Sequence, residues 1–138
     1  AAVLRIKLPL LDEYINARRA VADAYDAAFA DIPQITTPYR APYSYHVFHQ
    51  YTLQLNGADR NELQKYLAER EVPAMIYYPV PAHRQKMFEH FGGAAFDLPV
   101  TDNLTTKVIS LPIHTEMDPD QLEHIIQSVK SFLNNPRT

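Results

Sequence analysis

The stretch His46-Val-Phe-His-Gln-Tyr-Thr-Leu-Gln-Leu55 alternates between two kinds of side chain. In an extended chain every second residue falls on the same face. One of the two faces is mostly apolar and consists of Val47, His49, Tyr51, Leu53 and Leu55. The alternation predicts a half-buried strand over residues 46–55. Two shorter apolar runs, 72–78 and 108–111, predict a second and a third strand.

The part of the chain before this strand predicts two helices. Apolar residues recur at intervals of three, four or seven over residues 4–29, which is helical spacing. Pro9 lacks an N–H and clashes with the preceding turn, so a short helix is expected to end near Leu8 and a longer one to cover 10–30. The first residues show helical patterning without an N-cap residue, which indicates a start inside a helix. Residues 31–45 are expected to be an extended connector.

Three later helices are predicted from their ends. Asp59 has the position of an N-cap for a helix that runs to about residue 70. Asp118, which is followed by proline, is predicted to cap the last helix. Two glycines are expected to end a short helix over 83–91. Residues 97–107 are expected to form a loop with one helical turn.

These elements predict an α+β fold. The sheet is expected to be small, mostly antiparallel and three-stranded, covered by helices and preceded by a long helical segment. Residues 1–45 are predicted to form the helical segment and its connector. Residues 46–138 are predicted to form a small α+β domain.

Composition narrows the function classes. The chain has 138 residues with 13 Lys and Arg against 16 Asp and Glu, a formal charge of −3, and no basic run, so nucleic acid is not an expected partner. The absence of cysteine excludes disulfides, thiolate metal ligands and a cysteine nucleophile. No apolar run approaches the roughly 20 residues that span a bilayer. The composition predicts a soluble, cytoplasmic protein without a membrane partner.

His46 and His49 are three residues apart, a spacing that places two metal ligands together on a helix. On a strand the same spacing points them to opposite faces, so no metal site is predicted. Because His49 falls on the apolar face, it is expected either to pack in the core or to contact a ligand. One of the two histidines is the candidate for ligand contact.

Tyr77-Tyr78-Pro79-Val80-Pro81 ends the predicted second strand. Adjacent residues of a strand face opposite ways, so one tyrosine is expected in the core while the other offers its phenol to a ligand; a rigid turn with a packed aromatic is the alternative. His83, Arg84 and Gln85 follow at an expected helix start, where an anionic group such as a diphosphate could bind.

The candidates for substrate binding are thus six residues from two segments: His46, His49, Tyr77, Tyr78, His83 and Gln85. No catalytic residue is assigned, because Ser110 lacks His and Asp partners at a known spacing. None of the five lysines is expected in an apolar pocket, as imine chemistry requires. With three glycines the chain has no glycine-rich phosphate loop.

Several stretches occur in an order that is similar to one known family: Ala1-Ala-Val-Leu-Arg-Ile-Lys-Leu8, His46-Val-Phe-His-Gln-Tyr51, Ile76-Tyr-Tyr-Pro-Val-Pro-Ala-His83 and Ile109-Ser-Leu-Pro-Ile-His114. Over nearly its whole length the chain resembles the C-terminal part, or small domain, of the DegT-type PLP-dependent nucleotide-sugar aminotransferases.

This resemblance implies a fold-type I enzyme that transfers an amino group, usually from glutamate, to a nucleotide-linked keto-sugar. It implies that pyridoxal 5'-phosphate (PLP) is bound mainly by a large domain outside this chain, that the enzyme is a homodimer, and that the isolated chain is inactive. By this resemblance His46 or His49, together with residues 77–85, would approach the cofactor or the sugar nucleotide. A same-family PLP-dependent sugar dehydratase and a stand-alone ferredoxin-like binding or interaction domain are the alternatives.

Overall fold

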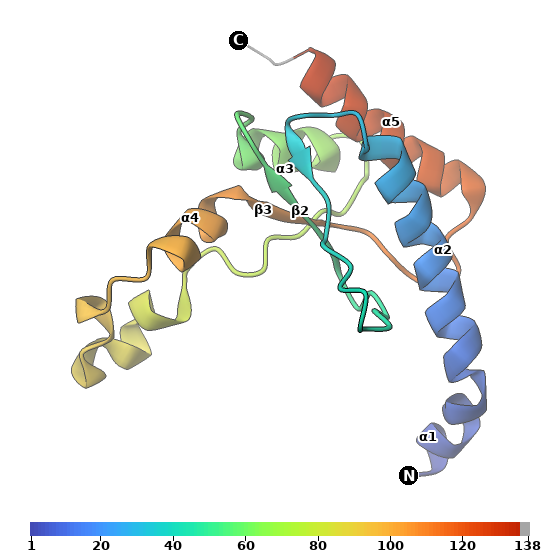
Figure 1. Ribbon diagram of the computed structural model, residues 1–138, viewed down its shortest axis with the longest axis horizontal. Coiled ribbons are helices and arrows are strands. Elements are labelled where there is room, and N and C mark those ends of the chain that lie inside the picture. Colours follow the sequence, from blue (N-terminus) through green and yellow to red (C-terminus); the bar gives the residue numbers. More distant parts are fainter. Residues whose placement is uncertain (136–138) are drawn as a thin grey trace.

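The computed structural model describes residues 1–135 (Figure 1). Residues 136–138, the end of the predicted domain 46–138, lie outside the described residues. The elements, with short 3-10 helices labelled η, are α1 (Ala2–Lys7), η1 (Leu8–Leu10), α2 (Leu11–Phe29), β1 (Ile35–Thr36), β2 (Tyr51–Leu55), α3 (Arg60–Ala68), η2 (Ala82–Arg84), η3 (Lys86–Phe91), η4 (Gly93–Ala95), α4 (Pro99–Lys107), β3 (Val108–Leu111) and α5 (Pro119–Asn134).

The strands form one sheet in the order β1-β2-β3, and both pairings are antiparallel. Ile35 lies opposite Leu55, and Leu53 lies opposite Ile109. The predicted α+β class, with a three-stranded antiparallel sheet after a long helical segment, is confirmed.

Two predicted strands differ from the structure. The strand expected over 46–55 begins only at Tyr51. The strand expected over 72–78 is reduced to Met75, which pairs with Ser110 of β3 through hydrogen bonds of 3.0 and 2.7 Å. Pro73 and Pro79 flank this run, and proline cannot donate to a ladder. The third strand of the sheet is instead β1, from the predicted connector.

The core lies between the sheet and the helices α2, α3 and α5. Figure 1 shows α2 and α5 side by side on one side of the sheet. Tyr25 of α2 is buried, and its hydroxyl donates to the carbonyl oxygen of Pro112 at 2.8 Å. The largest fully buried side chains come from these elements and from the segments next to them: Tyr25, Phe29, Phe48, Tyr51, Leu53, Leu55, Leu63, Leu67, Val72, Ile109 and Val129.

The helix ends follow the capping residues. The backbone bends into the 3-10 helix η1 around Pro9, as predicted. Asp118 forms a full capping box with Gln121 at the start of α5, and Asp59 accepts backbone hydrogen bonds at the start of α3. In place of the single helix expected over 83–91, the structure has two short 3-10 helices, η2 and η3.

Residues 97–107 contain the nine-residue helix α4 rather than a loop with one turn. This helix has no buried residue, so it lacks the apolar stripe by which sequence patterns reveal helices.

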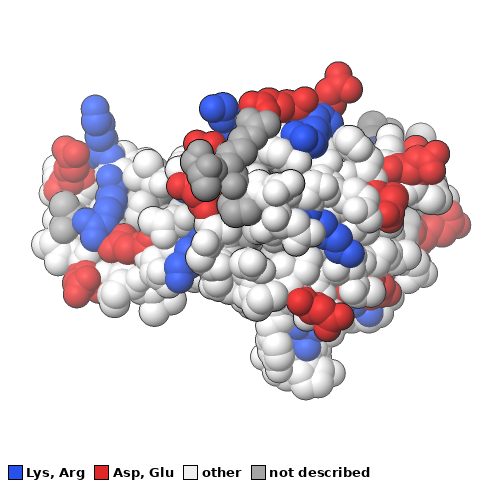
Figure 2. Space-filling model, turned by 90° about the horizontal axis from the view of Figure 1, so that it is seen from above, with Lys and Arg blue, Asp and Glu red and all other residues white. Residues whose placement is uncertain are grey.

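Residues 77–107, which we call the lobe, project away from the sheet at the left of Figure 1. None of the core side chains that the structure describes as buried belongs to the lobe. On the face shown in Figure 2, Lys and Arg are interspersed with Asp and Glu, in the lobe as in the rest of the chain. Among the described residues, no helix is both long and apolar enough to cross a membrane.

Candidate functional site

The six candidate residues lie in two separate places. His46 and His49 belong to the loop of residues 37–50, which connects β1 to β2, and the other four belong to the lobe. Figure 1 shows this loop and the lobe projecting from different parts of the sheet. Within residues 1–135, no hydrogen bond, ion pair or ring contact joins them. The chain therefore presents two candidate surfaces rather than one closed pocket.

The predicted place of His49 on the apolar face is wrong. His49 is exposed, whereas its neighbour Phe48 is completely buried. Phe48 has a φ of 48°, in the left-handed region, which interrupts the strand alternation just before β2. The core side chain is therefore the phenylalanine, and the imidazole of His49 points to solvent.

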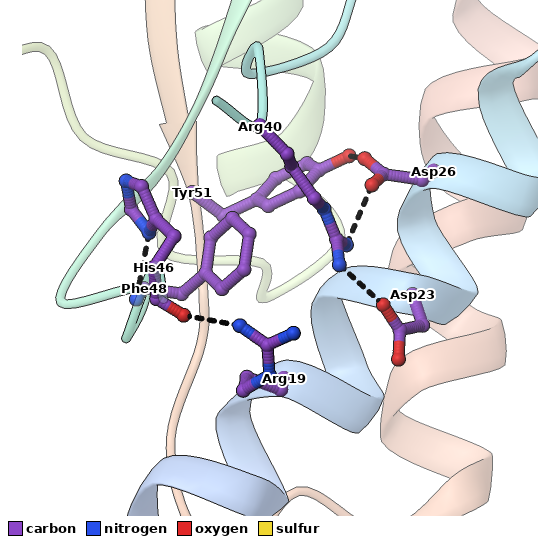
Figure 3. A network of polar contacts seen from close by, with 7 residues as sticks. All are labelled: Arg19, Asp23, Asp26, Arg40, His46, Phe48 and Tyr51. Atoms are coloured by element: carbon purple, nitrogen blue, oxygen red, sulfur yellow. Dashed lines mark hydrogen bonds and ion pairs between the residues drawn. The ribbon is translucent and has the colours of Figure 1, made fainter. Parts of the chain in front are cut away.

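The left-handed Phe48 lies against a group of polar side chains that we call the Arg40 network (Figure 3). The network consists of Arg40, Asp23, Asp26 and Tyr51. The Arg40 guanidinium lies 2.5 Å from an oxygen of Asp23 and 2.6 Å from an oxygen of Asp26, both on α2. It also lies 4.7 Å from the centre of the Phe48 ring. The hydroxyl of Tyr51 donates to Asp26. The network thus ties the loop and the start of β2 to one helix.

Two side chains of this network, Tyr51 and Arg40, have raised pKa values. Burial and then the hydrogen bond to Asp26 raise the pKa of the Tyr51 phenol, so the hydroxyl stays neutral and acts as a donor. Burial would lower the pKa of Arg40, but hydrogen bonds and charge from Asp23 and Asp26 outweigh it and raise the pKa. One arginine faces two carboxylates, so the network favours the charged form of Arg40.

A second arginine fixes the tip of the same loop. Arg19 of α2 donates to the carbonyl oxygen of His46 at 2.8 Å and lies 4.0 Å above the ring centre of Tyr45. The Tyr45 hydroxyl donates to Asn16 at 3.0 Å. Three contacts from α2 therefore hold residues 45 and 46 in one arrangement.

The ring of His46 has a defined orientation. Its Nδ1 accepts the backbone N–H of Phe48 at 3.0 Å, and its ring centre lies 4.2 Å from that of Phe48. Because Nδ1 is the acceptor, the proton of the neutral imidazole lies on Nε2. The exposed His46 can therefore offer a hydrogen-bond donor to a bound molecule.

In the lobe, Tyr77 is 38% exposed and Tyr78 is 68% exposed. The expectation that one of them lies in the core is wrong, because the strand ends at Met75 and the chain leaves the sheet before the tyrosines. Tyr78 lines a shallow groove of about 490 Å³ together with Gln85. The remaining lining residues are Pro79, Val80, Arg84 and Lys86.

His83 and Arg84 face a carboxylate of α4. Arg84 donates to both oxygens of Asp102, at 2.9 and 2.5 Å. The Nε2 of His83 is buried without a hydrogen-bond partner and lies 3.5 Å from Asp102. Because η2 has three residues, it offers no extended helix N-terminus, and the donors available to an anion here are side-chain N–H groups.

Sequence reasoning did not indicate the charged residues that hold these surfaces: Arg19, Asp23, Asp26, Arg40 and Asp102. Asp23 and Asp26 are three residues apart in a predicted helix, a spacing that places both carboxylates on one face and could have indicated a cation partner. No local pattern marks Arg40 or Asp102. The described residues contain no group of three or more His, Asp or Glu that could hold a metal ion.

Comparison with known proteins gives consistent matches over nearly the whole chain. Residues 1–130 match the DegT/DnrJ/EryC1/StrS aminotransferase family. A pleiotropic regulatory protein of Geobacillus stearothermophilus is 34% identical over 96% of this chain and 36% of its own length. A UDP-N-acetyl-3-dehydro-alpha-D-glucosamine 3-aminotransferase of Acidithiobacillus ferrooxidans is 36% identical over 97% of this chain and 35% of its own length.

A solved structure supports the same relationship. S. venezuelae DesV, crystallised with a ketimine intermediate, superposes with a TM-score of 0.90 at 30% identity, over 99% of this chain and 36% of DesV. The chain thus spans about a third of the length of the relatives that it matches. It belongs to the DegT/DnrJ/EryC1/StrS aminotransferase family.

Proposed function

We propose that this chain is the C-terminal part of a PLP-dependent aminotransferase that transfers an amino group, with glutamate as donor, to a nucleotide-linked keto-sugar. The match of residues 1–130 to an aminotransferase family carries the proposal. The relative from Acidithiobacillus ferrooxidans, named for a UDP-linked substrate, supports the substrate class.

The exposed groups of the two surfaces suit a sugar nucleotide. His46 offers a fixed Nε2 donor, His49 is free in solvent, and Tyr77 and Tyr78 offer phenols. The groove adds the Gln85 amide, the Lys86 cation and the N–H groups of Arg84 that Asp102 does not use, all of which can donate to a diphosphate. We propose that His46, His49, Tyr77, Tyr78, His83 and Gln85 contact the sugar nucleotide once the two surfaces are completed by the rest of the enzyme.

The residues present do not fit PLP. Imine chemistry needs a lysine in a protected pocket, whereas Lys7, Lys65 and Lys86 are exposed and Lys107 and Lys130 are partly exposed. No glycine-rich loop is available for the phosphate. In this proposal PLP is held mainly by a large domain outside this chain, and the isolated chain is inactive.

The exposed apolar residues of α1 and η1 support a role as part of a larger protein. Neither element has a buried residue, although both carry large apolar side chains: Val3, Leu4, Ile6, Leu8 and Leu10. We propose that residues 1–45 lead from the large domain into the small domain 46–138, and that the complete enzyme is a homodimer whose interface lies near the site.

A chimeric enzyme tests the proposed function. We would replace the corresponding third of the Acidithiobacillus ferrooxidans relative with this chain and measure amino transfer from glutamate to its UDP-linked keto-sugar. The expected result is PLP-dependent transfer, with a raised KM for the sugar nucleotide in the His46→Ala and Gln85→Ala variants. The matched variants His90→Ala and Gln127→Ala are expected to leave KM unchanged. A folded, PLP-containing chimera without transfer would contradict the proposal.

A further inference from the structure

The carboxylate of Asp102 connects two parts of the lobe that are 18 residues apart in sequence. Its Oδ1 accepts the Nε–H of Arg84 at 2.9 Å, and its Oδ2 accepts an N–H of the same guanidinium at 2.5 Å. The same Oδ1 lies 3.5 Å from Nε2 of His83. We infer that Asp102 is a positioning residue, which holds Arg84 and His83 in the arrangement that shapes the groove.

Packing alone does not fix this arrangement. None of the large apolar side chains of the lobe is among the buried core residues, and Met87, Phe91 and Val100 are well exposed. A close backbone contact also contributes. The backbone at Gly93 approaches the carbonyl oxygen of His83 so closely that a Cβ at position 93 would lie 2.5 Å from this oxygen. Side-chain links between α4 and η2 run through Asp102, which makes a two-point contact with Arg84 and also lies 3.5 Å from His83.

The geometry of the pair is specific. A guanidinium that meets both oxygens of a carboxylate is fixed in its plane as well as in its position. The hydrogen bond from Arg84 lowers the pKa of Asp102, so the carboxylate remains charged at neutral pH. Asp102 thus sets the plane of the Arg84 guanidinium at the edge of the groove.

The guanidinium of Arg84, although it contacts Asp102, retains N–H groups that can donate to a ligand. Arginine has five N–H donors, and the contact with Asp102 uses two of them. The same arginine lines the groove beside Gln85 and Lys86. On the function proposed above, Asp102 orients Arg84 toward the diphosphate without touching the ligand itself.

The first test needs no ligand. In the 138-residue chain, Asp102→Asn is expected to speed the exchange of the Arg84 Nε–H with water and to shift the ring resonances of His83 in NMR spectra. Asp97→Asn is the matched control, since it removes the same charge near Arg84 without removing a hydrogen bond. Unchanged Arg84 and His83 signals in Asp102→Asn, or equal changes in both variants, would overturn the inference.

The second test uses UDP as the probe and the chimeric enzyme described above, in which the two surfaces are completed. Asp102→Asn is expected to raise the dissociation constant for UDP about tenfold. Arg84→Gln is expected to have a similar effect, and the double variant no more than either, because both changes remove the same oriented donor. Additive effects would overturn the positioning role. Failure of the unaltered chimera to bind UDP would contradict the function proposed for the groove, while the ligand-free test would still decide the role of Asp102.

Discussion

At the scale of single residues, Arg40 is the side chain on which the loop of residues 37–50 depends. It contacts two carboxylates of α2 and the face of Phe48. Arg40→Gln would leave Asp23 and Asp26 facing each other without a cation. We expect the free energy of unfolding in urea to fall by about 1–2 kcal/mol, a value reduced for partial exposure.

The matched control for this change is Arg5→Gln on α1, an exposed arginine whose side chain forms no hydrogen bond or ion pair within the described chain. It is expected to change the unfolding free energy by less than about 0.5 kcal/mol. Equal losses in the two variants would show that net charge, rather than the Arg40 network, is responsible.

The two buried phenols predict a loss of stability at alkaline pH. Burial raises the pKa of Tyr25 and of Tyr51 far above that of a free tyrosine. The folded state therefore keeps both protons when the unfolded state loses them. Their contribution is complete below about pH 10 and declines as the pH rises, by up to about 1.4 kcal/mol per pH unit for each tyrosine.

Urea titrations at increasing pH, followed by circular dichroism and tyrosinate absorbance, check this expectation. Tyr25→Phe should reduce the alkaline slope, whereas Tyr39→Phe, at an exposed position, should not. Ionisation of both buried tyrosines before any loss of secondary structure would contradict it.

The two histidines show what the sequence could predict at this scale. Alternation correctly placed Tyr51, Leu53 and Leu55 in the core. It was wrong for His49, because the left-handed backbone of Phe48 interrupts the alternation just before β2 and places Phe48, rather than His49, in the core. A phenylalanine gives no sign of such a conformation, which is most common for glycine, asparagine and aspartate. Contacts between residues far apart in sequence, such as Arg40 with Asp26, decide the conformation here.

At the scale of elements, Gly93 is expected to be essential for the packing of the lobe. A Cβ at this position would lie 2.5 Å from the carbonyl oxygen of His83 and 2.9 Å from that of Phe88. Gly93→Ala should therefore separate η4 from η2. We expect faster amide hydrogen exchange over residues 82–98, with unchanged protection of β2 and β3.

Gly57→Ala provides the comparison. Gly57 has a φ of 77°, but a Cβ at this position would have no atom within 4 Å, so alanine there brings backbone strain without a clash. Its effect should be confined to the turn between β2 and α3. The explanation for Gly93 would be wrong if its variant left exchange in the lobe unaltered.

Element ends could be predicted better than element interiors. The break at Pro9 and the caps at Asp59 and Asp118 depend on local chemistry, and the structure has all three. The strand over 72–78 could not be judged locally, because pairing depends on which edge of the sheet is available. The helix α4 has no buried stripe, so its existence depends on contacts that the sequence pattern does not contain.

At the scale of the whole molecule, the family resemblance could be predicted because it rests on the order of several stretches along the chain. The match over residues 1–130 confirms it. The separation of the loop from the lobe could not be predicted, because the local pattern of one segment carries no information on where the other lies. A sugar nucleotide that contacts both surfaces would need further residues to close the gap, which is consistent with a chain one third as long as its relatives.

The exposed apolar side chains of α1 and η1 predict self-association of the isolated chain. A soluble monomer rarely exposes a contiguous apolar surface of this kind without a partner. Sedimentation velocity is expected to show a larger species that increases with protein concentration. The variant Leu4→Glu/Leu8→Glu should shift the equilibrium to monomer, because it places charge within the apolar surface. Arg5→Glu on the same helix is the control, expected to retain association. A monomer at every concentration, or equal loss in the control, would show that this surface does not drive assembly.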